Sequence, residues 1–398
     1  MNENELKPEF VGITGLNPFV AHDSSSRSTM FSNHFSQRLA IADPDEKCVQ
    51  SGLEKEISKY TFSISMPENG RIINIIERYP RGIGEDSLSL NPETVVIYEI
   101  DETKEIDYFT IPNFASYHQF FGFKYVFKEG INKIRPDAFI AKGTIFADSN
   151  SVSENGGFKY GINLNVAFMS VPAVSDDGLV ISKDVLDRLK FPIYETRIVE
   201  FGSKNFPLNI YGSKDKYKPF PDIGEYINDT RGDGILMMLR EYDSKLAPVD
   251  LSIYDTMEPD FVFDKAIYVR GGAGRVIDIK VISNNSRVKQ LPDEVCSHIE
   301  KYKKAYLEFH KEIIKTEERL RYDYKRKYGE NKLNVTPKLH NLLVESLAIL
   351  NYNETKLKQP LNLFYRQTPI DEYMIEFTIE YNIKPNIGFK LTDEHGKK

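Results

Sequence analysis

The sequence predicts an α+β protein in which a β-rich part is followed by a long helical segment. Apolar and polar residues alternate from Tyr60 to Met66 and in several later stretches, which is the period of a half-buried strand. Between Val295 and Leu320 apolar positions instead recur every three or four residues, as in a helix packed along one seam. The 23 tyrosines and 25 phenylalanines favour a packed β core over disorder.

Length and charge limit the classes of function. A chain of 398 residues is long enough for two or three domains with their own cores. The net charge is −7, so any contact with nucleic acid must be local. Cys48 and Cys296 form no CxxC, which excludes a zinc ribbon and is typical of a reducing cytosol. No apolar run reaches the ~18 residues of a membrane span, so we expect a soluble, cytoplasmic protein without membrane contact.

The first half of the chain divides into two regions. Residues 1–58 read as loops and short helices, and residues 59–204 as a β core. RIINIIERY, VVIYEI and IDYFTI are successive strands, and residues 130–149 predict two strands joined by a turn at Gly143. The nearly unbroken apolar run NLNVAFM, residues 163–169, predicts a buried strand.

Residues 205–292 return to strand patterns, in GILMMLRE and in KAIYVRGGAGRVIDIKVI. The GGAG in the second stretch is similar to a nucleotide-binding glycine loop, but no helical pattern follows it. We therefore interpret it as a turn between two strands.

Residues 293–358 predict an antiparallel helical hairpin that projects from the β part. The seam predicts a helix from Asp293 to Tyr328, ended by Gly329, and Thr336-Pro337 begins a second helix with a capping hydroxyl and a proline at its first position. Ten Lys and Arg face five Asp and Glu between Lys301 and Tyr328. This basic excess is either an ordinary solvated face or a contact surface for nucleic acid or an acidic partner. Residues 359–398 complete the chain with a strand and a lysine-rich loop.

Three short stretches carry candidate chemistry. Asp176 and Asp177 follow the apolar run, and paired carboxylates at a strand end can hold Mg²⁺ together with substrate phosphates, although Asp-Asp-Gly also forms turns. Arg27 lies among serines in SSSRSTM and could bind a triphosphate through bidentate hydrogen bonds. Lys390 and Lys398 flank a turn-like ending and offer point charges to a phosphodiester.

Five stretches resemble, in the same order, the central to C-terminal part of the β subunit of multisubunit DNA-dependent RNA polymerases. They are residues 16–38, 51–54, 161–182, 271–282 and 375–398. The separate and shortened form is most similar to the split β subunits of large bacteriophages.

The resemblance implies a fold. Residues 59–204 and the return strand of 359–398 would build most of a double-psi β-barrel, and residues 1–58 would add the N-terminal loop and helix segment of its active-site face. Residues 205–292 would be a flap-like β insertion, and residues 293–358 the helical excursion of that region.

The resemblance also implies roles for the candidate residues. Arg27 matches an arginine that contacts the incoming nucleotide, and Asp176 and Asp177 match a Glu-Asp pair near the second magnesium ion, which arrives with the nucleotide. Lys390 and Lys398 match two lysines that lie against phosphates at the RNA 3′ end. The first Mg²⁺ would be held by a partner subunit, because no DFDGD-like run is present.

The sequence departs from the family at some of these positions. Ser24 replaces an aspartate, Gly178 replaces a serine, and Asp393 and Glu394 bring negative charge between the two lysines. The family's glycine and its next strand do not follow Lys398.

The implied function is that of a β-subunit fragment of a DNA-directed RNA polymerase, a nucleotidyltransferase that is inactive alone. It would contribute nucleotide-triphosphate, second-magnesium and RNA 3′-end phosphate contacts to template-dependent RNA synthesis. Expected partners are other β fragments, β′-like subunits, the DNA template, the RNA product and nucleoside triphosphates, in the host cytoplasm during phage infection. The alternatives are a non-catalytic virion or scaffold protein with a polymerase-derived fold, and a freestanding Mg²⁺ hydrolase that uses Asp176 and Asp177.

Overall fold

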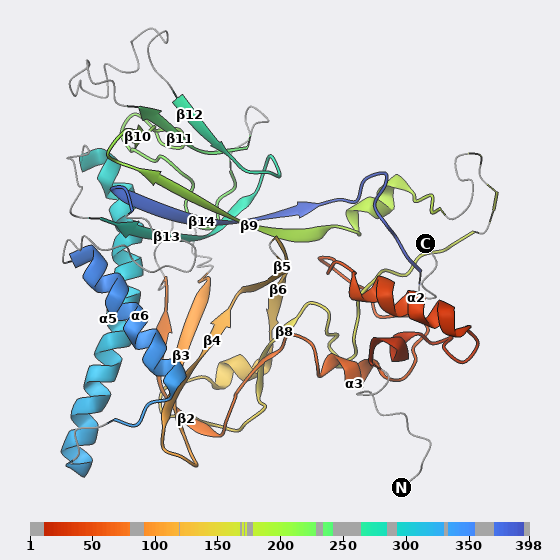
Figure 1. The fold of residues 1–398 in the computed structure, drawn as a ribbon, viewed down its shortest axis with the longest axis horizontal. Helices are drawn as coiled ribbons and strands as arrows, with labels where there is room; N and C mark the ends of the chain where they lie inside the picture. The colour runs from red at the N-terminus through yellow and green to blue at the C-terminus, as the bar shows by residue number, and fades with distance from the viewer. Residues whose placement is uncertain are drawn as a thin grey trace.

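The computed structural model is built around one large antiparallel sheet (Figure 1). The residues that it describes are 12–79, 91–118, 120–167, 169–170, 172, 178–227, 234–241, 264–284, 293–329, 333–354 and 370–393. The large sheet has seven strands in the order β1-β8-β6-β9-β14-β13, with β5 paired to β6. Their bounds are Ile64–Ser65 for β1, Phe114–His118 for β5, Phe121–Phe127 for β6, Ile145–Ser149 for β8, Phe191–Phe201 for β9, Arg275–Ser283 for β13 and Tyr373–Ile383 for β14.

Strand β14, near the end of the chain, lies inside this sheet. It pairs with β9 along its full length, from Tyr373 opposite Phe201 to Ile383 opposite Phe191. On its other side it pairs with β13, from Ser283 to Arg275. Strand β14 therefore lies between two strands that are far from it in the sequence, and its side chains point alternately to the two faces of the sheet.

Two smaller antiparallel sheets flank the large one (Figure 1). The four-stranded sheet has the order β4-β3-β2-β7, and the three-stranded sheet has the order β10-β11-β12. Their bounds are Gly70–Glu77 for β2, Glu93–Ile100 for β3, Ile106–Pro112 for β4, Phe139–Ile140 for β7, Asn205–Pro207 for β10, Ile235–Glu241 for β11 and Asp264–Tyr268 for β12. Three short 3₁₀ helices complete the described chain with α2 and α3: η1 is Gly12–Leu16, η2 Glu129–Lys133, η3 Lys183–Asp187, α2 Ser25–Ser36 and α3 Glu54–Ser58.

A buried ion pair joins the four-stranded sheet to the large one. The Arg78 guanidinium, just after β2, donates to Asp278 of β13 across 2.5 Å, and both side chains are almost fully buried. Arg78 also donates to Glu93 of β3, and the neighbouring Tyr79 hydroxyl donates to the Ile279 carbonyl. Removing one member of such a pair leaves an unpaired buried charge, so these contacts fix the relative position of the two sheets.

The two long helices have the expected bounds. Helix α5 is Asp293–Tyr328 and α6 is Pro337–Glu354, and Gly329 ends α5 in the left-handed conformation with φ of 73°. The Thr336 hydroxyl accepts a hydrogen bond from the Leu339 N–H at 3.2 Å, as a helix cap does, and donates to Asp107. Residues 355–358 of the predicted hairpin lie outside the described residues.

The hairpin lies against the sheets instead of projecting from them (Figure 1). Ile299 and Tyr302 pack into the core above the large sheet, while Phe309 and Ile313 pack on the four-stranded sheet. Helix α6 has half the length of α5 and cannot cover its seam alone. The sheets cover the rest, because an apolar seam must be buried.

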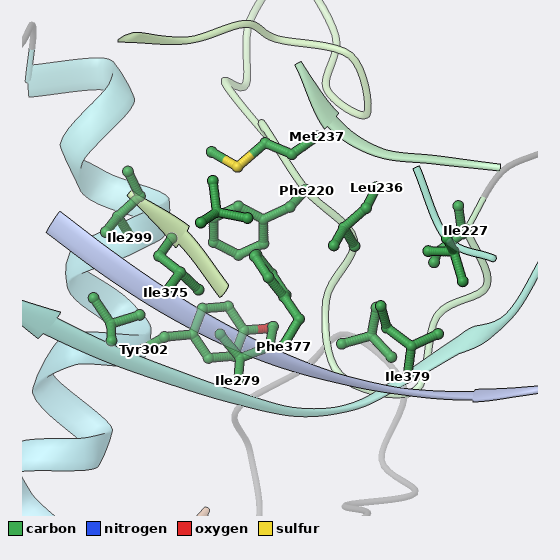
Figure 2. Close-up of a cluster of buried hydrophobic side chains, with 14 of the residues drawn as sticks. Phe220, Ile227, Leu236, Met237, Ile279, Ile299, Tyr302, Ile375, Phe377 and Ile379 are labelled. Carbon is green, nitrogen blue, oxygen red and sulfur yellow. The ribbon is translucent and has the colours of Figure 1, made fainter. Parts of the chain in front are cut away.

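The largest core lies between β9, β14 and β13 on one side and α5 and the three-stranded sheet on the other. Figure 2 shows Phe377 of β14 near Phe220, and the two rings meet edge to face at 5.1 Å between centroids. Phe377, Ile375 and Ile379 of β14 are fully buried, as is Ile279 of β13. Burial of these side chains is the main force that holds the late strand in the sheet.

Two strand predictions are wrong in detail. Among the described residues of 163–169 there is no strand, and Val166 and Met169 are 66% and 71% exposed. The alternation from Tyr60 gives only the two-residue β1, with Tyr60 and Phe62 exposed. An apolar run indicates that a segment can be buried. It does not indicate whether another strand lies beside the segment to pair with it.

The structure is β-rich with few helices, and its curled antiparallel sheets are compatible with a β-barrel. The double-psi connection, the flap-like character of 205–292 and the domain boundaries stay predictions. No helix among the described residues is long and apolar enough to cross a membrane.

Phe377→Ala should destabilise the fold by about 3–5 kcal/mol, because it leaves a cavity in the largest core. The measurement is the free energy of unfolding from urea titration. Phe139→Ala removes the same ring where it is 57% exposed and should cost less than about 1 kcal/mol. Equal losses in both variants would contradict the assigned core.

Stability should fall as the pH falls below about 6.5, the ordinary histidine pKa. Burial lowers the pKa of His298 to about 4 and that of His310 to about 3. Between pH 6.5 and 4 the unfolded chain therefore binds protons that the folded chain does not. The free energy of unfolding should fall by about 1.4 kcal/mol per pH unit for each of these histidines.

His310→Asn should make the fall in unfolding free energy shallower, because the amide keeps a polar contact to Ser346 but does not titrate. His340→Asn is the control on the exposed side of α6 and should leave the slope unchanged. An unchanged slope for His310→Asn would contradict the assignment.

Candidate functional site

Helix α2 presents Arg27 on a small core of its own. Phe31 and Phe35 of α2 are buried against Leu16 and Phe158. The Arg38 guanidinium lies over the rings of Phe35 and Phe158, at 4.8 and 5.1 Å from their centroids. Burial lowers the pKa of Arg38. Because buried side chains from two other segments, Leu16 and Phe158, pack against α2, its first turn has a fixed position.

The first turn of α2 begins with a serine cap. Ser24 Oγ accepts a hydrogen bond from the Arg27 N–H at 3.3 Å, so this serine caps the helix. The Arg27 side chain is half-buried, and it makes no ion pair with any residue that the structure describes. The guanidinium is thus available to an anion from outside the described chain, and the helix N-terminus adds a favourable dipole.

Asp45 ties together the two ends of the segment that contains Asp176 and Asp177. Its carboxylate accepts hydrogen bonds from the Asn163 N–H at 2.9 Å and from the Arg188 guanidinium at 2.7 Å. The Asn163 N–H, followed by Arg188, lowers the pKa of Asp45. Since Asn163 precedes and Arg188 follows this segment, Asp45 closes it into a loop.

The segment after β14 is anchored to η3. The Lys384 ammonium is 2.6 Å from the Asp187 carboxylate, which also binds Lys190 at 2.9 Å. Hydrogen bonds from Lys384 and Lys190 lower the pKa of Asp187 to about 2. The Phe389 ring lies 6.0 Å from that of Phe191. These contacts hold the segment leading to Lys390 beside the end of the loop that Asp45 closes.

Arg27 and Lys390 lie in parts of the chain that are directed to the same end of the molecule. Helix α2 and the segment that follows β14 are at the end of the longest axis opposite α5 (Figure 1). Lys390 is exposed. Asp176, Asp177 and Lys398 lie outside the described residues, so a single cleft formed by Arg27, Asp176, Asp177 and Lys390 stays a prediction.

Metal ligation was predicted for Asp176 and Asp177. Across the described ranges, no group of three or more His, Cys, Asp or Glu side chains is placed to hold a metal ion. Carboxylates are the ligand type that Mg²⁺ prefers, but two of them leave most of its octahedral shell to water and substrate phosphates. The two aspartates are therefore predicted to share the Mg²⁺ ion with substrate phosphates and water. This role stays a prediction.

The sequence does not indicate the positioning roles of Asp45 and Asp187. Neither belongs to a recognisable motif, and each contacts residues more than a hundred positions away in the chain. Only the acidic residue beside a proline, in ADPDEK, marks Asp45 as a turn residue.

Comparison with known proteins gives distant relatives. No protein-family model matches the chain. The chain is 23% identical over 345 residues to the DNA-directed RNA polymerase subunit beta of Chlamydia caviae, covering 81% of this chain and 25% of that protein. It is 22% identical over 379 residues to the corresponding subunit of Protochlamydia amoebophila, covering 89% and 26%. With the subunit of Chlamydia muridarum it shares 21% over 419 residues, covering 97% and 31%.

These similarities support a distant relation to the polymerase β subunit. The chain spans about a quarter of the length of the curated relatives that it matches. The matched regions include β9 and β14 as well as α2 in the alignment that covers 97% of the chain.

Asp45→Ala should loosen residues 164–188, because it removes the acceptor shared by Asn163 and Arg188. We expect faster amide hydrogen exchange in peptides of this segment, measured by mass spectrometry, with little change in β9 or β14. Asp43→Ala is the matched control, since Asp43 is an exposed aspartate two residues away. Exchange that rises equally in the two variants would contradict the proposed role of Asp45 in holding Asn163 and Arg188 together.

Proposed function

We propose that this chain is part of the β subunit of a DNA-directed RNA polymerase, split over more than one polypeptide as in large bacteriophages. The observation that carries the proposal is the similarity to polymerase β subunits over 81% to 97% of the chain. A protein that kept only a scaffold role would be expected to resemble polymerase β subunits only in its buried core. The five stretches that resemble the β subunit in sequence also include the polar segments around Arg27, Asp176 and Lys390.

The anchoring contacts support a shared site. Asp45 closes the loop of Asp176 and Asp177, and Asp187 connects the end of that loop to the segment of Lys390. The chain that follows α2, the helix of Arg27, reaches the same region, since the Ala42 N–H donates to the Lys190 carbonyl at 2.8 Å. Three segments far apart in the sequence therefore meet at residues 187–190.

The side chains would act on phosphates. Arg27 would bind the triphosphate of the incoming nucleotide through a bidentate contact, and Lys390 and Lys398 would neutralise phosphates at the RNA 3′ end. Asp176 and Asp177 would supply oxygen ligands to the Mg²⁺ that arrives with the nucleotide, which stabilises charge on the leaving phosphate oxygens. The ion that activates the RNA 3′ hydroxyl would be held by a β′-like partner chain.

The alternative function is a non-catalytic virion or scaffold protein. The exposed apolar residues Val166, Met169 and Val180 are compatible with it, because a structural partner could cover them. The same residues would be covered by other subunits of a polymerase, so activity has to separate the two functions.

Asp177→Ala and Lys390→Ala should each lower the rate of single-nucleotide addition by about 10²–10³-fold in the assembled polymerase, with assembly unchanged. The residues would stabilise charge that develops during phosphoryl transfer. Rates are measured by quenched flow on a preformed RNA–DNA scaffold, and assembly by size-exclusion chromatography.

Lys142→Ala is the control, since Lys142 is an exposed lysine bonded to Glu68 on the edge of the four-stranded sheet. It should leave the rate unchanged. Wild-type rates in both site variants would refute their roles, and a complex that is active without this chain would refute the proposed function.

A further inference from the structure

The exposed face of α5 carries a stripe of positive charge. At 100° per residue, ten residues between Lys304 and Arg326 lie within about 60° of Tyr322 on the side opposite the buried seam, and all of them except the half-buried Leu307 are exposed. The members of this basic stripe are Lys304, Glu308, Lys311, Lys315, Glu318, Arg319, Tyr322, Lys325 and Arg326. Six are cationic and two are acidic, in a chain whose net charge is −7. From Lys304 to Arg326 the stripe extends for about 33 Å, at ~1.5 Å per residue.

Most of this charge is not neutralised within the described chain. Arg319, Lys325 and Arg326 are exposed and make no ion pair with any described residue. Lys304 and Lys315 only approach Glu308 and Glu312 on α5 itself, at 3.9 Å, with the lysine side chains 76% and 68% exposed. Exposed pairs at such distances contribute little, so these lysines remain open to another anion.

A groove runs beside the stripe. It lies between α5 and β2, has a volume of about 1100 Å³, and is lined by Lys304, Lys311 and Lys315 of the stripe. Lys301 and Lys303 also line it, together with four glutamates. The surface is therefore concave as well as charged along half of the stripe.

Tyr322 stands in the most basic part of the stripe. Its side chain is 67% exposed, and Arg319, Lys325 and Arg326 are its neighbours one turn away. An exposed aromatic ring among cations can stack on a base while the cations bind the flanking phosphates. An acidic peptide would use the cations but would gain little from the ring.

We propose that the basic stripe binds single-stranded nucleic acid, with its phosphates along Lys304 to Arg326 and a base on Tyr322. The surface is at the end of the molecule opposite α2, so it is separate from the candidate site (Figure 1). The proposal does not rest on the function proposed above, because it concerns binding without chemistry.

The test measures binding of the full chain to a short fluorescent single-stranded DNA by anisotropy at several salt concentrations. The variant Arg319→Ala/Lys325→Ala/Arg326→Ala should bind about tenfold or more weakly at low salt. It should also reduce the slope of log affinity against log salt by about 2, since each phosphate contact contributes about 0.7 for single strands. Tyr322→Ala should weaken binding by about tenfold with little change in that slope.

Lys59→Ala/Lys104→Ala/Lys142→Ala is the matched control. It removes the same charge from exposed lysines elsewhere, each of which is paired with a carboxylate. It should bind like the unchanged protein. The proposal is overturned if the control loses as much affinity as the stripe variant, if the stripe and Tyr322 variants bind normally, or if duplex DNA or a polyglutamate peptide binds the stripe more tightly than the single strand does.

Discussion

The pairing of β14 with both β9 and β13 is the constraint on which the rest of the molecule depends. This strand closes a sheet whose other members come from residues 64–201 and 275–283. Its buried side chains, with Phe377 at the centre, also form the floor of the largest core. The segment after β14 contains Lys390. The strand that completes the core therefore also positions a candidate site residue near η3 and α2.

Ion pairs and hydrogen bonds fix the relative positions of sheets and loop segments that core packing does not determine. The Arg78–Asp278 pair is buried and sets one sheet against another, so loss of either partner would be strongly destabilising. The contacts of Asp45 and Asp187 are more exposed and contribute less to stability. Their role is positional, because they select one arrangement for segments in which apolar side chains such as Val166 and Val180 stay largely exposed. Loops of this kind commonly carry function on a rigid scaffold.

The elements with strong local signals could be predicted from the sequence. The bounds of α5 and the start of α6 follow from seam spacing, Gly329 and Thr336-Pro337. Strands β2, β3 and β4 follow from alternation, and β11, β12 and β13 from later apolar stretches with strand patterns. The packing of α5 on two sheets could not be predicted, because the same seam fits a partner helix or a sheet. Residues 163–169 show the converse case, in which an apolar run has no covering strand among the described residues. For the site, residue types and order suggested Arg27 and Lys390, while the anchors Asp45 and Asp187 depend on long-range contacts that no local pattern records.

We propose that this chain contacts the reacting ends of nucleotide and RNA in a polymerase. Photo-crosslinking from a thiouridine at the RNA 3′ end, in an elongation complex assembled with all subunits, tests it most directly. We expect adducts on this chain, mapped by mass spectrometry to the peptides of α2 or of the segment after β14. Adducts confined to other subunits, or found on this chain only along α5, would contradict it.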